Sequence, residues 1–446
     1  MLPFFLVGYL FLLIFRPYEY WSILGEFRVE RVYMIVFMIL VFLSREKKYI
    51  SSPINGVIII FFLVLIISGA FSISWNVSVF RIEEYFKFLV FYFVAIMSVR
   101  NEKEFRIVIL GFLAVMSLYV GKSAWEFFVH GRYEYRMGIK RMLGVDITYG
   151  NPNAFAASIV YSLPLLWAMI RCKFNNIWIQ TSLWFYAVLA IVSIIFTGSR
   201  SGMAAALLFF SIILLTSKQR LFAVLSIFFV LIISWQFMPE DLHTRFLSIF
   251  FDDVGPRNAQ MSAEGRLEGF LHGIEIFLNN PLVGVGPGNF SLTWDIRMNA
   301  HNIYGQLLGE LGLMGGLAFG FFLIMMVIKN SNVVRTFKSI SSHYDDTISL
   351  ILPRIDQVDH GSHRKFQNFP KHQFFKSSNS FFKDLGPVPL VFYSFVAQSI
   401  IHTIILMLFK GWADHNLYRY TWIWLGALTV LCHHFFYQEV ERIGQS

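Results

Sequence analysis

Long apolar runs recur along most of this chain, for example at Leu2–Phe15, Ile54–Ile73 and Ile303–Ile328. A helix needs about 20 mainly apolar residues to cross the hydrocarbon core of a bilayer, and such runs can supply them. The composition agrees, because 56% of the residues are hydrophobic and only 15% are charged, whereas soluble domains carry about 25% charged residues. The sequence therefore predicts an all-α fold, a polytopic helical membrane protein.

Hydropathy places about twelve transmembrane helices in the chain. They are expected at Leu2–Phe15, Val32–Leu43, Ile54–Ile73, Phe88–Ser98, Ile107–Gly121, Asn153–Ile170, Trp178–Phe196, Gly202–Thr216, Leu221–Trp235, Ile303–Ile328, Pro387–Leu408 and Tyr418–Phe436. Three regions follow: transmembrane helices in 1–235, a large loop in 236–302, and further transmembrane helices in 303–446. Within the last region, the polar and basic stretch 329–386 is interpreted as a cytoplasmic insertion.

The distribution of Lys and Arg predicts the orientation in the membrane. The loops after the second, fourth, sixth and eighth predicted spans carry Arg45, Lys47, Lys48, Arg100, Lys103, Arg106, Arg171, Lys173, Lys218 and Arg220. By the positive-inside rule these loops and both termini are cytoplasmic, although Arg16, Arg28 and Arg31 after the first span are an exception. The 236–302 loop is then on the outer face. Loop charge explains most of the net charge of +9, so nucleic acid is not expected as a partner.

Arg200 lies in the motif TGSRSG, at the outer end of a predicted span. A lone arginine at such a position can simply extend to the lipid headgroups. Here small residues surround it, so a phosphate group can approach the backbone. The helix that follows offers free N–H groups and the positive end of its dipole. Arg200 is therefore a candidate anion-binding residue.

Arg266 follows Gly265 in the motif EGRLEG. Apolar residues at helical spacing predict an amphipathic helix over Arg266–Leu278, lying on the membrane. Arg266 is either a solvated charge at the helix end or a second guanidinium that binds phosphate oxygens. Two such arginines on one face would suit a pyrophosphate group. The later segment GVGPGNF predicts a tight turn, and its spacing differs from the dinucleotide-binding fingerprint.

His301 opens the tenth predicted span, with Asn302 beside it and Glu310 further along. An interfacial histidine can be purely structural, but imidazole is also the natural general base near neutral pH. His301 could deprotonate a sugar hydroxyl, while the arginines opposite it hold a diphosphate. This combination predicts a site for glycosyl transfer.

Arg81 and Lys87 flank the predicted span Phe88–Ser98 on the outer side. Six residues apart on a helix, they would point about 120° away from each other. Both can be ordinary interfacial cations. If only one faces the site, Lys87 is preferred, because it adjoins the apolar run, where a charge costs more.

No metal site is predicted. The two cysteines lie at the ends of apolar runs, and the histidines of the 329–386 stretch lack a recognisable ligand spacing.

Several motifs, taken together and in order, resemble the O-antigen ligase and polymerase superfamily of bacterial envelope glycosyltransferases. They are NPNAFAAS (Asn151–Ser158), TGSRSG (Thr197–Gly202), EGRLEGFLHGIEIFLNNPLVGVGPGNF (Glu264–Phe290), AHNIYGQLLGELGLMGG (Ala300–Gly316) and HNLYRYTW (His415–Trp422). The resemblance implies a GT-C-like protein of the bacterial inner membrane, with a large periplasmic loop and an active site facing the periplasm. The stretch 329–386 departs from the family, where this connection is usually shorter.

The resemblance also implies a reaction. A glycan would be transferred from undecaprenyl pyrophosphate to an acceptor hydroxyl, with inversion at the anomeric carbon and without a metal, nucleotide sugar or other cofactor. Arg200 and Arg266 would bind the pyrophosphate, and His301 would activate the hydroxyl. Lys87 or Arg81 would add a further basic contact.

A ligase acting on lipid A–core is favoured, because the AHN…ELG arrangement at the end of one outer loop resembles it. An O-antigen or exopolysaccharide polymerase and a protein O-oligosaccharyltransferase share the donor chemistry and stay open as alternatives. A lipid-linked glycan flippase or other transporter is the alternative outside the enzyme class. Transporters place charges near the bilayer midplane and often show repeated halves, whereas the candidate residues here gather at one interface.

Overall fold

The computed structural model of the chain describes residues 1–44, 49–136, 139–216, 243, 258–294, 300–355 and 389–445. The described part is built almost entirely of helices. They are α1 (Leu2–Phe15), α2 (Ser22–Glu26), α3 (Val29–Leu43), α4 (Pro53–Ala70), α5 (Trp75–Ser98), α6 (Glu102–Phe128), α7 (Pro152–Arg171), α8 (Ile177–Phe196), α9 (Arg200–Thr216), α12 (Asn258–Asn279), α13 (Ile303–Ile355), α14 (Pro389–Gly411) and α15 (Tyr420–Gly444). Two single-turn 3-10 helices, η1 (Pro17–Glu19) and η2 (Phe290–Thr293), complete the set. The predicted all-α fold is confirmed.

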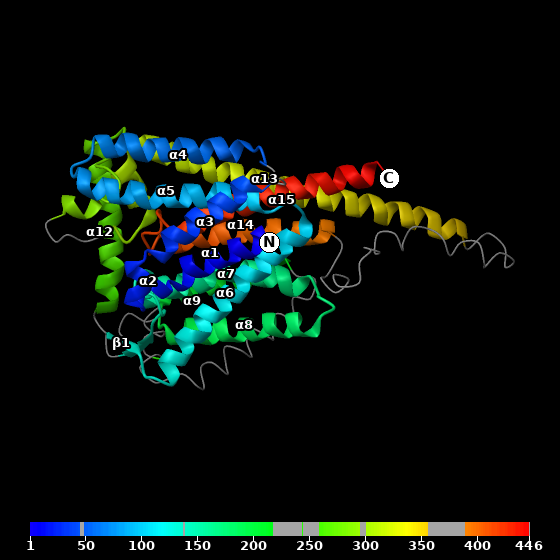
Figure 1. Cartoon of the computed structure of the whole chain (residues 1–446), viewed down its shortest axis with the longest axis horizontal. Coiled ribbons are helices and arrows are strands. Elements are labelled where there is room, and N and C mark those ends of the chain that lie inside the picture. Colours follow the sequence, from blue (N-terminus) through cyan, green and yellow to red (C-terminus); the bar gives the residue numbers. More distant parts are fainter. Residues whose placement is uncertain are drawn as a thin grey trace.

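Most of the long helices run side by side along the long axis of the molecule, whereas α12 stands across them at one end (Figure 1). The carboxyl end of α15 and the extension of α13 lie at the opposite end. The buried core between the helices is rich in aromatic rings. Trp424 of α15, for example, packs against Phe91 of α5 and Phe112 of α6, with ring centroids 6.0 and 5.7 Å apart.

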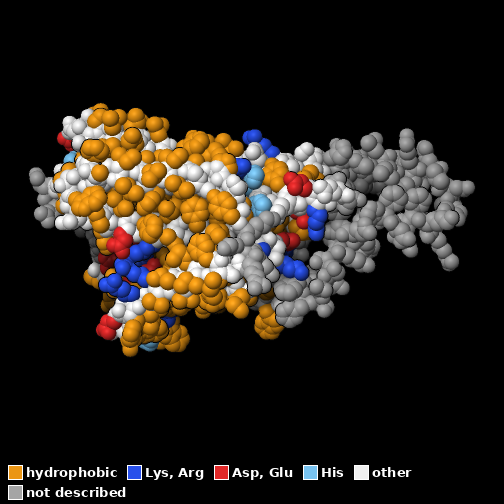
Figure 2. Space-filling model, turned by 45° about the horizontal axis from the view of Figure 1, so that its top comes forward, with side chains coloured by type: hydrophobic (Ala, Val, Ile, Leu, Met, Phe, Trp, Pro, Cys, Tyr) orange, Lys and Arg blue, Asp and Glu red, His pale blue; other side chains and the backbone are white. Residues whose placement is uncertain are grey.

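The outside of the bundle has the character of a lipid-facing surface. Hydrophobic side chains cover much of its flank, and charged side chains gather toward the ends (Figure 2). In the described part of the chain, seven helices are long and apolar enough to cross a membrane, and α9 is a shorter apolar helix. The protein is therefore a multi-pass membrane protein. Twelve crossings are not confirmed, and the predicted span Leu221–Trp235 lies outside the described residues.

Helix α13 is broken at Gly312, whose φ of 61° is unfavourable for residues with a side chain. The break leaves backbone groups of α13 without their helical partners, and the segment 281–286 bonds to them. The Val285 N–H donates to the Gly309 carbonyl at 3.0 Å, and the Leu313 N–H donates to the Pro281 carbonyl at 2.8 Å. The predicted turn segment is in this way attached directly to the interrupted helix.

Two helix boundaries and one additional hairpin differ from the sequence-based expectation. Helix α13 continues to Ile355, so the stretch interpreted as an insertion begins as helix, and its remainder from 356 lies outside the described residues. Helix α5 begins at Trp75, well before Phe88, because its charged turns are joined by i,i+3 and i,i+4 ion pairs. A short antiparallel hairpin, β1 (Tyr133–Arg136) with β2 (Ile139–Met142), connects α6 to α7 and was not predicted.

Candidate active site

The TGSRSG motif forms a tight turn that starts α9 at Arg200. Gly198 adopts a φ of 58°, and the Ser199 hydroxyl accepts a hydrogen bond from the Gly202 N–H at 3.2 Å. This bond satisfies one of the free N–H groups at the helix start. Arg200 is thus the first residue of the helix, as the sequence suggested, and it is half-buried.

Arg141, which sequence reasoning did not single out, anchors this turn. It is only 3% exposed. Its Nε donates to the Thr197 carbonyl at 2.8 Å, and its Nη2 donates to Asn153 Oδ1 at 2.9 Å. The turn before Arg200 is therefore tied to the beginning of α7, which is the NPNAFAAS motif.

Arg266 lies on α12, which covers the predicted amphipathic segment and confirms it as a helix. Two glycines bring α12 against the start of α13. A Cβ added at Gly269 would collide with the Ala300 carbonyl, and one added at Gly273 would collide with the Gly305 backbone. Burial lowers the pKa of Arg266, the positive charge of Arg200 lowers it further, and Asp414 opposes them. The two arginines predicted to share a site are therefore close enough to repel each other.

His301 precedes α13 and has a φ of 45°. Asn302 caps the helix, since its Oδ1 accepts from the N–H groups of Tyr304 and Gly305 at 2.9 and 3.1 Å. The same side chain donates to the Trp412 carbonyl at 3.2 Å. The loop between α14 and α15 is thereby held beside His301.

That loop, residues 412–419, carries an acidic and basic cluster that the sequence analysis missed. The Asp414 carboxylate lies 3.6 Å from Lys410 Nζ and 3.9 Å from Arg419 Nη1. Lys410 Nζ also donates to the Ser201 hydroxyl at 3.2 Å, next to Arg200. Burial alone would raise the pKa of Asp414, but Lys410 and the other positive or imidazole groups around it hold that pKa below its usual value. Asp414 is therefore an ionised carboxylate within a mainly cationic site.

Arg419 is buried and joins this loop to α7. It donates to the Ala154 carbonyl at 3.1 Å and to the Ser158 hydroxyl. Its guanidinium lies over the Tyr149 ring at 4.8 Å, and Arg16 lies over the same ring at 5.0 Å. The NPNAFAAS and HNLYRYTW motifs, far apart in the sequence, are thus in direct contact.

Glu310 holds the GVGPG turn in place. Gly284, Gly286 and Gly288 all have positive φ, which confirms the predicted tight turn. The Glu310 carboxylate accepts from the Gly288 N–H at 2.8 Å and from the Tyr418 hydroxyl at 2.6 Å. It therefore fastens the turn to the same loop that carries Asp414.

Arg81 and Lys87 occupy different surroundings on α5. The Arg81 guanidinium lies 5.9 Å from the Tyr418 ring, beside the GVGPG turn, and pairs with Glu84 at 2.8 Å. Lys87 Nζ lies 3.9 Å from Glu83, which also pairs with Arg31 of α3. Arg81 thus adjoins the cluster, whereas Lys87 pairs within α5 with Glu83, whose other ion pair, with Arg31, joins α5 to α3. The preference for Lys87 rested on its position next to the apolar run, whereas Arg81 is the one that lies beside Tyr418.

The three principal candidates lie within one recognised segment. The family model described as O-Antigen ligase matches residues 185–320, which include Arg200, Arg266 and His301. This match supports a place in the O-antigen ligase superfamily. Its members are membrane glycosyltransferases of the O-antigen ligase and polymerase type. No curated protein matches the chain.

The protein also has an apolar cavity of about 380 Å³ beside the charged cluster. It is lined by Ser201, Ala204, Tyr304, Leu408, Phe409, Lys410, Trp412 and Ala413. Lys410 and Ser201 belong both to the cavity wall and to the cluster. An amphiphile with an anionic headgroup can therefore place its two parts in adjoining spaces.

Among the described residues, no group of three or more His, Cys, Asp or Glu side chains is arranged to hold a metal ion. The metal-free reaction stays a prediction.

Proposed function

We propose that this protein transfers a glycan from undecaprenyl pyrophosphate to an acceptor hydroxyl, as an O-antigen ligase with lipid A–core as the acceptor. The observation that carries the proposal is the position of Lys410, whose Nζ lies 3.2 Å from the hydroxyl of Ser201, the residue after Arg200, and 3.6 Å from the Asp414 carboxylate. Arg266 and His301 are near enough to Asp414 for their charges to interact with it. The O-antigen ligase match over this segment supports it.

In the proposal Arg200 and Arg266 bind the pyrophosphate of the donor. Guanidinium groups can each donate two parallel hydrogen bonds to phosphate oxygens. Lys410 adds a buried positive charge, and the start of α9 adds backbone N–H groups. The apolar cavity next to Lys410 would take the first part of the lipid chain. Arg81 is the further basic contact, while Lys87 stays a candidate with weaker geometric support.

His301 acts as the general base. Its imidazole takes the proton from the acceptor hydroxyl as that oxygen attacks the anomeric carbon. The bond from this carbon to the pyrophosphate oxygen breaks, and its electron pair stays on the leaving group. Because the hydroxyl attacks from the face opposite the pyrophosphate, the configuration of the carbon inverts. Asp414 is close enough to interact with His301 and would stabilise the imidazolium that forms.

Positive side chains would neutralise the leaving group, so the proposal assigns no cofactor. Transfer would take place on the periplasmic face of the inner membrane, as the distribution of basic loops predicts.

The test is glycan profiling of a strain that lacks the gene, complemented with wild type, with Arg200→Ala or with Arg442→Ala. Arg442 is an exposed arginine of α15 that pairs with Glu439, and it serves as the control. Full-length polymer on undecaprenyl pyrophosphate together with bare core lipid, restored by wild type and Arg442→Ala only, would support the ligase. Single repeat units on the core would instead indicate a polymerase, and an unchanged lipopolysaccharide would contradict lipid A–core as the acceptor.

A further inference from the structure

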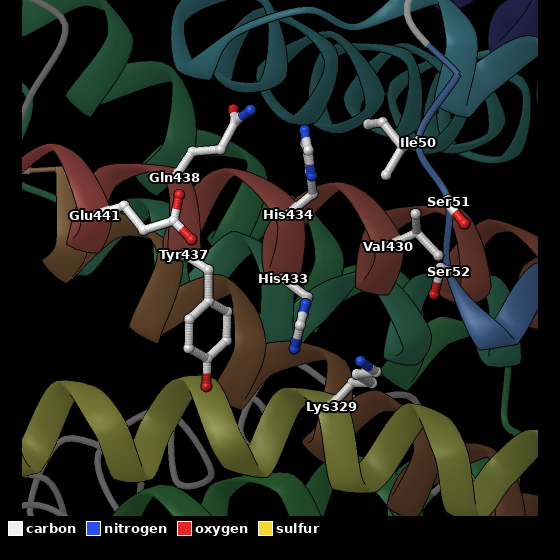
Figure 3. A pocket seen from close by; sticks show the side chains of 10 residues that line it. All are labelled: Ile50, Ser51, Ser52, Lys329, Val430, His433, His434, Tyr437, Gln438 and Glu441. Carbon is white, nitrogen blue, oxygen red and sulfur yellow. The ribbon is translucent and has the colours of Figure 1, made fainter.

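A second cavity lies between α13, α15 and the residues that lead into α4 (Figure 3). These segments meet at the end of the bundle opposite α12 (Figure 1). Its volume is about 340 Å³, within the range of small-molecule sites. It is lined by Ile50, Ser51, Ser52, Lys329, Val430, His433, His434, Tyr437, Gln438 and Glu441. Unlike the cavity beside Lys410, it is lined mainly by polar side chains.

A lysine and a histidine, both able to donate hydrogen bonds, face each other across this cavity. Lys329 of α13 and His433 of α15 point toward one another (Figure 3), and both are half-buried. The His433 ring packs against Tyr437 at 4.6 Å. Among the described residues, Lys329 has neither a hydrogen bond nor a salt bridge. Holding an ammonium group half-buried without a counter-charge is unfavourable, so an anion between these two side chains would stabilise the arrangement.

Hydroxyl groups add donors suited to an oxyanion. Ser51 and Ser52 line the cavity directly before α4. Because Ser52 Oγ accepts from the Ile54 N–H at 3.4 Å, its own hydrogen stays available to donate. Glu441 is the one carboxylate among the lining residues, and it lies two turns from His433, about 12 Å along α15.

The cavity is also placed at the boundary of the lipid-facing surface. Lys329 follows Ile328, and the apolar side chains of Phe321 and Ile324 one or two turns earlier on α13 are 51% and 56% exposed. An acyl chain can lie along this exposed surface while its headgroup reaches Lys329. Basic pockets between transmembrane helices at the cytoplasmic side are known to suit acidic lipid headgroups.

We propose that the Lys329 and His433 cavity is a binding site for a phosphate group, supplied by a phospholipid headgroup of the membrane leaflet opposite the transfer site. A soluble phosphate would use the same chemistry. The site does not depend on the proposed glycosyl transfer, because it lies at the other end of the helices and is tested by binding.

The experiment is native mass spectrometry of the full-length protein, titrated with phosphatidylglycerol alone, with inorganic phosphate alone, and with phosphatidylglycerol in the presence of inorganic phosphate. Wild type is compared with Lys329→Gln, His433→Gln and Lys338→Gln. Lys338 is exposed on the same helix, nine residues further on and about 180° around it, which makes it a matched control. Lys329→Arg keeps the charge, so it shows that any loss reflects charge and not misfolding.

We expect Lys329→Gln to weaken phosphatidylglycerol binding about tenfold, as the loss of one charge-assisted hydrogen bond would. His433→Gln should weaken it as well, whereas Lys329→Arg and Lys338→Gln should bind like wild type. Binding of the lipid that inorganic phosphate does not displace identifies the membrane as the source. Displacement by inorganic phosphate, with the same dependence on Lys329, identifies a soluble phosphate. Equal binding by Lys329→Gln and Lys338→Gln would overturn the proposal.

Discussion

The imidazole rings of His301 and His415 lie edge to face, with their centroids 5.4 Å apart. They come from opposite sides of the site, His301 from the residues before α13 and His415 from the loop before α15. Asp414 interacts with both. A proton taken up by either ring would therefore lie near a carboxylate. Substitution of each histidine in turn is needed to decide which one is the general base.

His301→Ala should reduce transfer by about 100-fold or more, which is the usual contribution of a general base. Donor binding should change little, because the arginines and Lys410 remain. Single-turnover transfer with purified protein and labelled lipid-linked donor measures the first effect, and donor equilibrium binding measures the second. His415→Gln is the comparison: a larger loss there than in His301→Ala would move the base assignment to His415.

Conservative replacement of the arginines tests how they hold the donor. Arg200→Lys and Arg266→Lys keep the charge but lose the paired hydrogen bonds, so we expect partial activity, while either alanine variant should abolish transfer. Transfer assays on membranes with matched protein levels would show this. Full activity of Arg200→Ala or Arg266→Ala would remove that residue from the site.

Asp414→Asn should destabilise the protein, because it leaves the fully buried Lys410 ammonium without its carboxylate. Removing one partner of a buried ion pair typically costs about 3 kcal/mol. Thermal unfolding in detergent should therefore show a lower Tm. The double variant Lys410→Met with Asp414→Asn removes both charges and should recover much of the Tm without recovering transfer. An unchanged Tm in Asp414→Asn would argue against the pairing.

Arg81 and Lys87 make a controlled pair on one helix. Arg81→Ala should lower transfer, since Arg81 adjoins Tyr418 and the GVGPG turn. Lys87→Ala should leave transfer near wild type, because the ion pair of Lys87 is with Glu83. Initial rates over a range of donor concentrations would separate them, and the reverse order of effects would restore Lys87 as the basic contact.

The pH dependence of transfer activity should reflect the protonation of His415. Desolvation lowers the pKa of His415 below its usual value near 6.5, and Arg81, Arg419 and Lys410 lower it further, although Asp414 opposes them. A lowered pKa means that the ring stays neutral at neutral pH and gains its proton only below 6.5. The ratio of wild-type to His415→Gln activity should then be constant from pH 8 to 6.5 and change only in more acidic buffer. A ratio that already changes between pH 8 and 7 would contradict this.

The helices and the principal candidates were predictable because each depends on local sequence. Apolar runs predicted helices such as α1 and α4. The small residues around Arg200 indicated a tight turn at the start of a helix, and the apolar spacing after Arg266 indicated an amphipathic helix. The family resemblance, now supported by the match over residues 185–320, predicts that they form one site.

The remaining site residues depend on contacts between distant segments. Nothing local marks Asp414, whose partners are Lys410 on the preceding helix and Arg419 after it. Arg141 bonds to Thr197 and Asn153 from a hairpin that the sequence did not indicate. The position of Asp414 directly before HNLYRYTW was the one available signal. For Arg81, the contact with Tyr418 likewise joins segments far apart in the sequence.

The glycine contacts of α12 determine where Arg266 lies relative to the rest of the site. Gly269 lies against Ala300 and Gly273 against Gly305, so close that neither glycine leaves room for a side chain. A slip of one residue would carry Arg266 about 1.5 Å along the axis and about 100° around it, away from Arg200. A larger side chain at either glycine would therefore push α12 away and reduce transfer as the loss of Arg266 would, although it touches no substrate. The absence of a side chain at these two positions thus sets the distance between Arg266 and His301.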